Sequence, residues 1–526
     1  MNRSDMLHRV QEQTGSGDSW DIVVIGGGAT GLGVAVDAAA RGYRVALFES
    51  SDFGKGTSSR STKLIHGGVR YLQQGNVPLV MEALRERGIL RTNAPHLVWD
   101  LPFVVPNYQW WEAPFYGIGM RVYDVLAGRY GFGRSQNLSV AETIDRLPTI
   151  ETGGLRGGVV YHDGQFDDAR LLVHMAMTAW EQGAVILNYC PVVNVTKSGD
   201  GFVDGVIVRD VESNQEIRVR SRVVINATGA WTDSVRDLDQ KGASPVIRPS
   251  QGVHIVLDRS FLPGSSAIMV PKTDDDRVLF AIPWHDRVLV GTTDTPVDTV
   301  VSEPRPRDEE VAFLLRHAAR YLARDPSADD VLSVFAGIRP LVSDVDDADT
   351  AGVSREHAIR ISDSGLISIA GGKWTTYRKM AKDAVSAAQA LGDLEDAGCP
   401  TRHLRLHGYH ANADRFGRLS VFGADAPEIE KLMRSRPGMG EPIHPRLDLT
   451  PAEIVWGCRE EMARTLDDML ARRSRSLILD ARAAIEAAPR VAAVMADELG
   501  FDGTWVTSQV SAFVAIARGY VWPPEA

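Results

Sequence analysis

The stretch DIVVIGGGATGLGVAVDAAARGYRVALFE at residues 21–49 decides the expected fold. The run at 21–25 is mostly apolar and β-branched, as is typical of a buried parallel strand. A glycine cluster ends this strand, small helix-forming residues follow at 29–41, and a second strand at 44–49 ends in an acid. This order of strand, helix and strand predicts a βαβ unit of a Rossmann-like fold.

The glycine cluster has the spacing of a dinucleotide-binding motif. Gly26, Gly28 and Gly31 form GxGxxG between a strand and a helix, where glycines permit a tight turn and a close approach of pyrophosphate to the helix N-terminus. Glu49 ends the second strand, where a carboxylate would accept hydrogen bonds from an adenosine ribose. A glycine turn beside a surface glutamate is the simpler alternative, but the flanking strand and helix favour a dinucleotide site.

Two later segments decide between NAD and FAD. A strand within 222–235 runs into small residues, and 366–391 predicts another strand, a glycine pair and a helix. The residues expected to let the backbone pass close to a dinucleotide are Ala227, Gly229, Gly371 and Gly372. The helix start would place backbone N–H groups beside a developing anion, and Lys373 adds a full positive charge. A reduced flavin carries such an anion, so FAD is expected, although a glycine turn with an exposed lysine is the simpler alternative.

Length and composition limit the other classes of function. At about 150 residues per domain, 526 residues suggest roughly three units, and 44% hydrophobic with 24% charged residues is typical of a globular chain. The net charge of −11 disfavours binding to nucleic acid, so no nucleic-acid partner is expected. The three cysteines lie far apart and no metal-ligand spacing occurs, which indicates a reducing compartment and no metal site.

The sequence also bears on where the protein lies relative to membranes. The first 19 residues are polar and predict a flexible arm, without the apolar core of a signal peptide, and no run of about 18 apolar residues follows. A cytoplasmic protein is expected. Segment 99–128 concentrates aromatic residues, which either seat the protein peripherally on the cytoplasmic face of the cell membrane or pack beneath a substrate domain.

Strand-rich and helical regions predict an α/β plus α+β organisation of three domains. A discontinuous FAD-binding domain is expected over 20–95, 150–240 and 350–395. An antiparallel-sheet substrate domain would occupy 96–149 and 241–349. From 396 to 526 the pattern has helical periodicity with i,i+4 charge pairs, which predicts a helical C-terminal domain.

The motifs together resemble a known family. TSSRSTKLIHGGVRYL at 57–72, with IGGGATGLG, NATGAW, GTTD, GIRPL and GGKWTTYR, is similar to the FAD-dependent glycerol-3-phosphate dehydrogenases, and REEMARTLDDMLARRSR at 459–475 is similar to their C-terminal domain. The resemblance implies noncovalent FAD and oxidation of sn-glycerol 3-phosphate to dihydroxyacetone phosphate by hydride transfer from C2 to flavin N5. It further implies a membrane quinone as the next electron acceptor, and a homodimer is left open.

Such a substrate needs positive charge for its phosphate and a base for its hydroxyl proton. The resemblance implies that Arg339 and Arg355 lie near the phosphate and that Arg70 and Tyr71 belong to the substrate site. An isolated arginine is more often a solvated surface charge, but the apolar, glycine-rich neighbours of Arg339 favour a buried role.

The base is assigned to one of two histidines, since an imidazole titrates near neutral pH. His66 lies on the glycine-rich loop expected to pass the flavin, whereas His254 lies in an apolar strand, where a lone histidine is more often a core residue. Lys373 is assigned to either flavin or substrate, and Thr293 to a hydroxyl contact or a strand end. The polar residues expected to contact pyrophosphate and flavin, unless they form an ordinary polar loop, are Thr57, Ser58, Ser59 and Lys63.

Three rival functions stay open at this point. A glycerol-3-phosphate oxidase would share the motifs and pass electrons to oxygen instead of quinone. An oxidase of amino acids or of other hydroxy acids would need a carboxylate-binding arginine and no phosphate site, which several arginines disfavour. A flavin-binding protein without turnover would keep oxidised FAD with every substrate.

Overall fold

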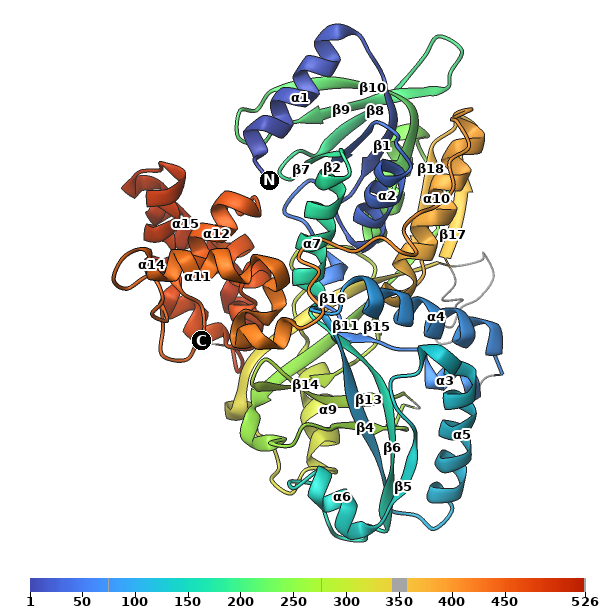
Figure 1. Ribbon diagram of the computed structural model, residues 1–526, viewed down its shortest axis with the longest axis vertical. Coiled ribbons are helices and arrows are strands. Elements are labelled where there is room, and N and C mark those ends of the chain that lie inside the picture. Colours follow the sequence, from blue (N-terminus) through green and yellow to red (C-terminus); the bar gives the residue numbers. More distant parts are fainter. Residues whose placement is uncertain (74, 276, 343–356, 525–526) are drawn as a thin grey trace.

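The protein is built from two sheets and a helical layer beside them, as seen in the computed structural model (Figure 1). The structure describes residues 1–73, 75–275, 277–342 and 357–524, and the side chains of Arg70 and Gln73 fall outside the description. The predicted fold class, α/β plus α+β with a helical C-terminal region, is confirmed.

The first sheet has the strand order β17-β18-β10-β1-β2-β7, and its central pairs are parallel. Its strands are β1 (Trp20–Ile25), β2 (Val45–Phe48), β7 (Val185–Leu187), β8 (Val192–Lys197), β9 (Val203–Arg209), β10 (Glu216–Asn226), β17 (His357–Ile361) and β18 (Ile367–Gly371). The helices packed around it are α1 (Arg3–Ser16), α2 (Ala29–Ala40), α7 (Asp168–Glu181), α8 (Thr232–Asp239) and α10 (Tyr377–Leu391). This arrangement contains the βαβ unit predicted from 21–49.

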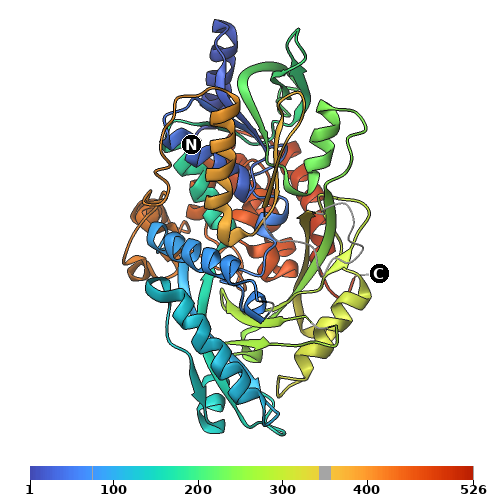
Figure 2. The same cartoon turned by 90° about the vertical axis from the view of Figure 1, so that its right-hand side faces the viewer.

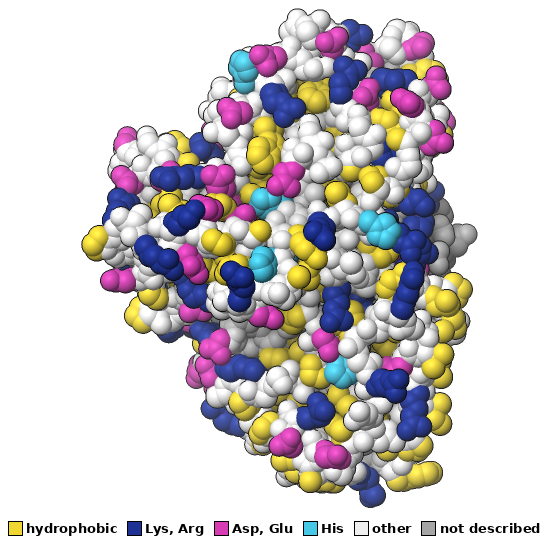
Figure 3. Space-filling model, in the orientation of Figure 1, with side chains coloured by type: hydrophobic (Ala, Val, Ile, Leu, Met, Phe, Trp, Pro, Cys, Tyr) yellow, Lys and Arg dark blue, Asp and Glu magenta, His cyan; other side chains and the backbone are white. Residues whose placement is uncertain are grey.

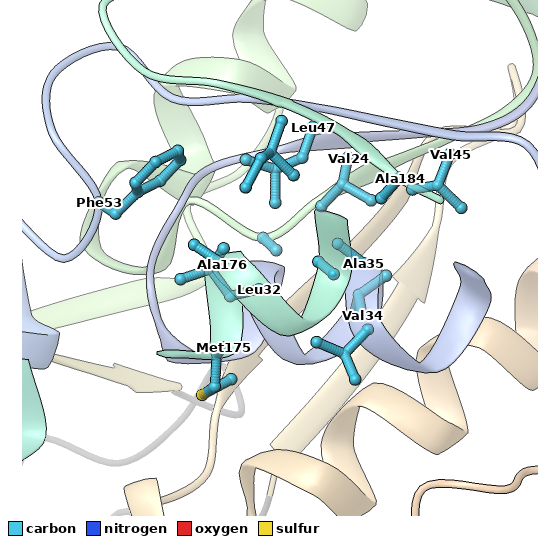
Figure 4. Close-up of a cluster of buried hydrophobic side chains, with 14 of the residues drawn as sticks. Val24, Leu32, Val34, Ala35, Val45, Leu47, Phe53, Met175, Ala176 and Ala184 are labelled. Carbon is cyan, nitrogen blue, oxygen red and sulfur yellow. The ribbon is translucent and has the colours of Figure 1, made fainter. Parts of the chain in front are cut away.

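The core of this unit lies between the sheet and its helices. Val24 of β1 and Leu47 of β2 are fully buried and face Leu32 of α2, and Ala176 of α7 closes the same cluster (Figure 4). A parallel strand covered on both faces is apolar where it is covered, which explains the uninterrupted apolar run at 22–25. The small residues of α2 let this helix pack closely against both α7 and α10.

The second sheet is mostly antiparallel, with one parallel pair between β12 and β4. Its strands are β3 (Leu64–Ile65), β4 (Val98–Asn107), β5 (Gln136–Leu138), β6 (Gly157–Phe166), β11 (Ile247–Asp258), β12 (Ala267–Val270), β13 (Leu279–Trp284), β14 (Arg287–Gly291), β15 (Thr295–Pro296) and β16 (Val331–Val342). The helices beside it are α3 (Val69–Gln73), α4 (Val77–Asn93), α5 (Glu112–Ala127), α6 (Val140–Arg146) and α9 (Asp308–Ala319). Strands β3 and β6 pair within this sheet, although the predicted boundaries placed them in the FAD-binding domain.

The C-terminal layer is helical, as predicted. Its helices are α11 (Ala426–Ser435), α12 (Pro451–Glu460), α13 (Ser476–Leu479), α14 (Ala481–Leu499) and α15 (Gly503–Ala517). They lie to one side of the junction between the sheets, and the quarter turn of Figure 2 places them behind it. A π-helical turn at Asp468–Arg473 joins α12 to α13 and packs against α7.

The flexible arm predicted for the first 19 residues is wrong. Residues 3–16 form α1, and the side chain of Asn2 caps it by accepting hydrogen bonds from the backbone N–H groups of Ser4 and Asp5. The guanidinium of Arg3 is 8% exposed and lies 2.5 Å from the Asp210 carboxylate. A buried ion pair therefore docks this helix on the first sheet, which polarity alone did not indicate.

Candidate active site

The glycine turn after β1 is shaped by close backbone contacts. Gly26 has φ +107°, and a Cβ there would lie 2.8 Å from the carbonyl oxygen of Ala227 on the neighbouring β10 end. A Cβ on Gly31 would lie 1.9 Å from the Gly26 carbonyl oxygen, so α2 could not start this close to the turn with any side chain there. The turn thus leaves the α2 N-terminus open toward a ligand, as pyrophosphate binding requires.

Glu49 closes this turn from the β2 end. Its carboxylate accepts hydrogen bonds from the backbone N–H groups of Gly27, at 2.6 Å, and Ser51, at 2.8 Å. Burial raises the pKa of Glu49, although these hydrogen bonds oppose the shift. The side chain also lines the cavity described next, so it both shapes the turn and presents oxygen to a ligand.

A cavity of about 410 Å³ lies at the ends of β1, β2, β10 and β18. The predicted cofactor residues that line it are Gly26, Gly28, Glu49, Thr57, Ser58, Ala227, Gly229, Gly371 and Gly372. Ser58 accepts a hydrogen bond from the first backbone N–H of α2 through its hydroxyl, at 3.0 Å. Glycines lacking Cβ atoms, a strand-end carboxylate and two helix starts together fit FAD.

Three predicted cofactor residues do not line this cavity. Gly31 acts through the tight contact already described. Ser59 is buried and donates its hydroxyl to the Gly54 carbonyl at 2.8 Å. Lys63 is fully buried, with its Nζ 2.8 Å from both carboxylate oxygens of Asp168, so it forms an internal ion pair instead of contacting pyrophosphate. Burial lowers the pKa of Lys63, and Asp168 opposes that shift.

A second cavity of about 320 Å³ adjoins the first, and both are lined by Thr57, Lys373 and Trp374. The predicted catalytic and substrate residues that line it are His66, Tyr71, His254, Thr293, Arg339 and Lys373. These residues come from the loop after β3, from α3, from β11 and β16, from the segment after β14, and from the turn between β18 and α10. The structure therefore brings together side chains up to about three hundred positions apart in the sequence.

Arg339 is held in place by oxygen atoms at the end of β14. Its guanidinium lies 3.1 Å from the Asp294 carboxylate, donates to the Thr292 hydroxyl at 3.1 Å and donates to the Thr293 carbonyl at 2.9 Å. A Cβ on Gly252 would lie 2.4 Å from its Nη2, so only glycine at 252 lets the guanidinium pass. Arg339 is therefore a fixed positive group at the cavity wall.

His254 is buried beside this arginine. Its ring stacks on Phe335 with centroids 4.9 Å apart, and its Nε2 lies 2.9 Å from the Thr62 hydroxyl. Within the described ranges its Nδ1 has no hydrogen-bond partner. Burial, reinforced by the positive charge of Arg339, lowers the pKa of His254 well below its usual value. The imidazole is consequently neutral at pH 7.

Lys373 joins the two cavities. Its Nζ lies 3.7 Å from the centroid of the Tyr71 ring, which places a cation over an aromatic face. The following residue, Trp374, donates its indole N–H to the Ser58 carbonyl at 2.8 Å and thereby ties the turn before α10 to the segment after β2. Trp374 was not predicted as a site residue, although it lies within the quoted motif GGKWTTYR.

The remaining predicted residues have different outcomes. The Thr293 hydroxyl donates to Glu310 at 3.0 Å and accepts from the Val253 N–H at 3.0 Å, so both contacts are internal. Arg70 lies in α3, but its side chain falls outside the description, and Arg355 lies outside the described residues. Arg277 lines the second cavity and was missed, because nothing in its acidic neighbourhood distinguishes it from a surface charge.

Segment 99–128 divides between the core and the surface. Strand β4 and the inner face of α5 are buried, including Tyr116 at 8% and Tyr123 at 1% exposure. The outer face of α5 and the residues before it expose Trp110, Phe115, Ile118, Val122 and Val125. Figure 3 shows hydrophobic side chains along the edge where α5 lies in Figure 1. The buried part fits the predicted packing beneath the substrate domain, and the membrane contact of the exposed part stays a prediction.

Two absences hold for the described ranges. None of the helices there is long and apolar enough to cross a bilayer. No three histidine, cysteine or acidic side chains there come together in a group that could hold a metal ion.

The family described as FAD dependent oxidoreductase matches residues 21–378, which span both cavities described above. The chain belongs to this family. A second family, described as the C-terminal domain of alpha-glycerophosphate oxidase, matches residues 367–505. The mitochondrial glycerol-3-phosphate dehydrogenases of Homo sapiens and Mus musculus are each 42% identical to this chain in sequence. The matches cover 92% of this chain and 71% of each relative.

Solved structures agree with this membership. The glycerol-3-phosphate dehydrogenase of Bacillus halodurans, complexed with FAD, superposes with a TM-score of 0.80 at 28% identity and covers 100% of this chain and 98% of its own. The glycine oxidase of Geobacillus kaustophilus, with a TM-score of 0.53 at 20% identity, covers 73% of this chain and shares the fold alone. The protein is therefore an FAD-dependent oxidoreductase of the glycerol-3-phosphate dehydrogenase family.

Proposed function

We propose that this family member oxidises sn-glycerol 3-phosphate to dihydroxyacetone phosphate, with FAD as the first electron acceptor and a quinone as the next. The observation that carries the proposal is the pair of adjoining cavities lined in common by Thr57, Lys373 and Trp374. One cavity fits a dinucleotide, and the other presents cations and imidazoles to a small anionic alcohol. The printed names of the mitochondrial relatives support the choice of glycerol 3-phosphate.

When bound, FAD supplies a two-electron acceptor for the hydride that leaves C2 of the substrate. Gly26, Gly28 and Glu49 would hold its adenosine and pyrophosphate portions, because they line the turn at the α2 N-terminus. Lys373 would stand beside its flavin portion, since this lysine lines both cavities. The charge of this lysine, in the turn between β18 and α10, would then favour the electron-rich reduced form.

Arg339 is proposed to bind the substrate phosphate. A planar guanidinium can donate to two phosphate oxygens at once, and the contacts of Arg339 with Asp294, Thr292 and Thr293 position it at the cavity wall. Arg277 lines the same cavity and adds a second positive charge, offset in part by Asp275 at 3.3 Å. This pairing leaves the cavity suited to an anion.

His66 is proposed to accept the hydroxyl proton. It lines the substrate cavity on the loop between β3 and α3, close in sequence to Tyr71. His254 is less suited to hold that proton, because its burial beside Arg339 disfavours an imidazolium. His254 would instead act as a neutral hydrogen-bonding group toward the substrate.

The exposed face of α5 is proposed to rest on the membrane that holds the quinone. Trp110, Phe115, Ile118 and Val125 have 77%, 54%, 65% and 79% of their surface exposed, and aromatic and aliphatic side chains prefer the lipid interface to water. The buried face of the same helix lies on the second sheet that carries the substrate cavity. Docking through α5 would bring that cavity's unit to the membrane surface.

Sedimentation with vesicles of phosphatidylcholine and phosphatidylglycerol tests this surface. A double variant with Ile118→Asp and Val125→Asp should stay in the supernatant, because two charges would have to enter the interface. Val211→Asp is the matched control, since Val211 is 52% exposed on the first-sheet unit. Co-sedimentation of the double variant at the level of wild type would contradict the membrane assignment.

The reaction itself is tested by anaerobic mixing of the holoenzyme with glycerol 3-phosphate while the visible flavin absorption is recorded. Rapid bleaching that a quinone analogue reverses is the expected result. Reversal mainly by oxygen would identify the oxidase alternative. FAD that stays oxidised with glycerol 3-phosphate would overturn the proposed substrate.

A further inference from the structure

The cofactor loop, residues 49–60, has one side toward the dinucleotide cavity and another toward the C-terminal helices. The members of the loop that line the cavity are Glu49, Ser50, Ser51, Gly54, Lys55, Gly56, Thr57 and Ser58. Gly54 has φ +76°, so the chain turns here through a left-handed conformation that glycine adopts without strain. A loop of this composition needs contacts from elsewhere to keep one shape.

Asp52 provides the first such contact. Its carboxylate lies 2.5 Å from Nε of Arg472 and accepts two hydrogen bonds from Arg473, at 2.6 and 2.9 Å. All three side chains are almost completely buried, with exposures of 0%, 3% and 2%. Burial alone would raise the pKa of Asp52, but the guanidinium groups of Arg473 and Arg472 hold it below its usual value. The loop is thus bound by charge to the C-terminal layer.

Lys55 provides the second contact, and it lines the cavity itself. Its Nζ lies 2.6 Å from the carboxylate of Asp467, which also pairs with Arg472 at 2.8 Å. Glu303, from the second-sheet unit, pairs with the same Nζ and accepts from the Tyr520 hydroxyl at 3.1 Å. The lysine is therefore held between two carboxylates instead of extending into solvent.

The chemistry of these contacts points to positioning. Buried ion pairs contribute little net stability, because the desolvation of each charge offsets most of the attraction, but they fix geometry. Residues 467–473 form three ion pairs with the loop, in which Asp467 contacts Lys55 and both arginines contact Asp52. Within the segment, Arg472 also pairs with Asp467 and Asp468. Apolar residues of similar volume often replace such pairs without loss of stability, so the retained charges point to a role in holding the loop in one geometry.

We propose that segment 467–473 is a positioning element for the cofactor: it fixes the cofactor loop from behind and thereby slows the release of FAD. The C-terminal layer then retains the cofactor without contacting it. Only the FAD part of the proposed function is needed for this inference, and glycerol 3-phosphate plays no part in it.

The test measures FAD release from the holoenzyme without substrate. Free FAD is recovered by ultrafiltration at intervals after dilution of wild type, Arg473→Lys and Asp467→Asn. Arg473→Lys keeps the charge but loses the two-pronged contact, and Asp467→Asn keeps the volume but loses the charge facing Lys55. Both should release FAD about tenfold faster, within the usual range of coupling between sites.

Arg459→Gln is the matched control. Arg459 is an arginine of the same layer that makes a two-pronged pair with Glu498, at 2.5 and 2.9 Å, and its side chain is 51% exposed. Loss of this pair should leave FAD release at the wild-type rate. A merely structural role is distinguished by thermal unfolding of the apo and FAD-loaded forms of each variant.

The proposal requires that the variants lose more stability with FAD bound than without it. Equal losses in the two forms, or FAD release at the wild-type rate from folded variants, would overturn it. If Arg473→Lys does not fold, Asp467→Asn decides the outcome alone. A holoenzyme that retains FAD but does not turn over glycerol 3-phosphate would overturn only the proposed substrate.

Discussion

Arg339 combines two properties of a side chain that binds phosphate, a fixed position and a planar set of hydrogen-bond donors. Arg339→Lys keeps the charge but cannot donate to two phosphate oxygens in one plane. We expect kcat/KM for glycerol 3-phosphate to fall about 10- to 100-fold, which corresponds to roughly 1.5–3 kcal/mol for hydrogen bonds to a charged group. Steady-state kinetics with a dye acceptor measures this. Unchanged kcat/KM at full FAD content would remove Arg339 from the phosphate site.

Two buried histidines predict how stability depends on pH. His96 Nε2 lies 2.9 Å from His174 Nδ1, and burial lowers the pKa of His96 to about 3 and that of His174 well below its usual value. An unfolded histidine titrates near pH 6.5. Below that pH the unfolded chain binds protons that the folded protein does not bind. The two histidines therefore do not lower the unfolding free energy above pH 6.5. The unfolding free energy falls as the pH drops from 6.5 toward 3.

The corresponding experiment compares wild type with His174→Gln in urea unfolding at pH 7, 6 and 5. Well below pH 6.5, each histidine that stays neutral in the fold contributes about 1.4 kcal/mol per pH unit to the loss of unfolding free energy, and less between pH 7 and 6. The variant lacks one such group, so its unfolding free energy should depend on pH less steeply by about this amount. The same slope in both proteins would show that His174 is protonated in the folded state.

Single residues also show what sequence reasoning can and cannot reach. Glu49 was predicted from its place at the end of the second strand, because strand order and glycine spacing determine where such a residue lies. Lys63 stands among hydroxyl residues that suit a phosphate site, and nothing local reveals Asp168 as its partner. A contact between residues 105 positions apart depends on the path of the whole chain.

At the scale of elements, α5 is apolar on two faces for different reasons. Its outer face is exposed, whereas Tyr123 on its inner face accepts a hydrogen bond from the Gly67 N–H at 2.8 Å and donates to Asp163 at 2.7 Å. Gly67 directly follows His66. Sequence periodicity could not separate these faces, because both are rich in aromatic and aliphatic residues.

Tyr123→Phe tests this connection between α5 and the His66 loop. The variant leaves the buried Gly67 N–H without its acceptor, which should cost about 1–3 kcal/mol of unfolding free energy. Because the displaced loop carries His66, kcat should fall more than KM rises. Chemical denaturation and dye-linked kinetics give the two quantities. Wild-type stability and kcat in this variant would contradict the connection.

Element boundaries were predicted where local signals are strong and missed where tertiary pairing decides. The strand before the glycine turn and the helices after residue 400 follow from apolar periodicity alone. Strand β6 pairs with β4 in the second sheet, and nothing in its own residues indicates which sheet it joins. Polar α1 gains its helix from the Asn2 cap and the Arg3–Asp210 pair, and sequence periodicity reports neither.

At the scale of the whole molecule, the three units meet around the cofactor loop. The first sheet supplies the cavity floor, Glu303 of the second-sheet unit reaches Lys55, and segment 467–473 of the C-terminal layer pairs with Asp52. Binding of FAD should therefore stabilise residues beyond those it touches, because a ligand that binds only the folded state lowers the population of locally opened forms.

Hydrogen exchange of the apo and FAD-loaded protein measures how far this effect extends. FAD should slow exchange of the backbone amides in 467–479 as well as those in the cofactor loop, since opening of either segment breaks the same buried ion pairs. Amides of α6, which packs against β4, β5 and β6 of the second sheet, serve as the internal reference. Protection confined to the cofactor loop would mean that the C-terminal layer opens independently of the cofactor. In Asp467→Asn, the slowing in 467–479 should shrink while that in the glycine turn after β1 persists.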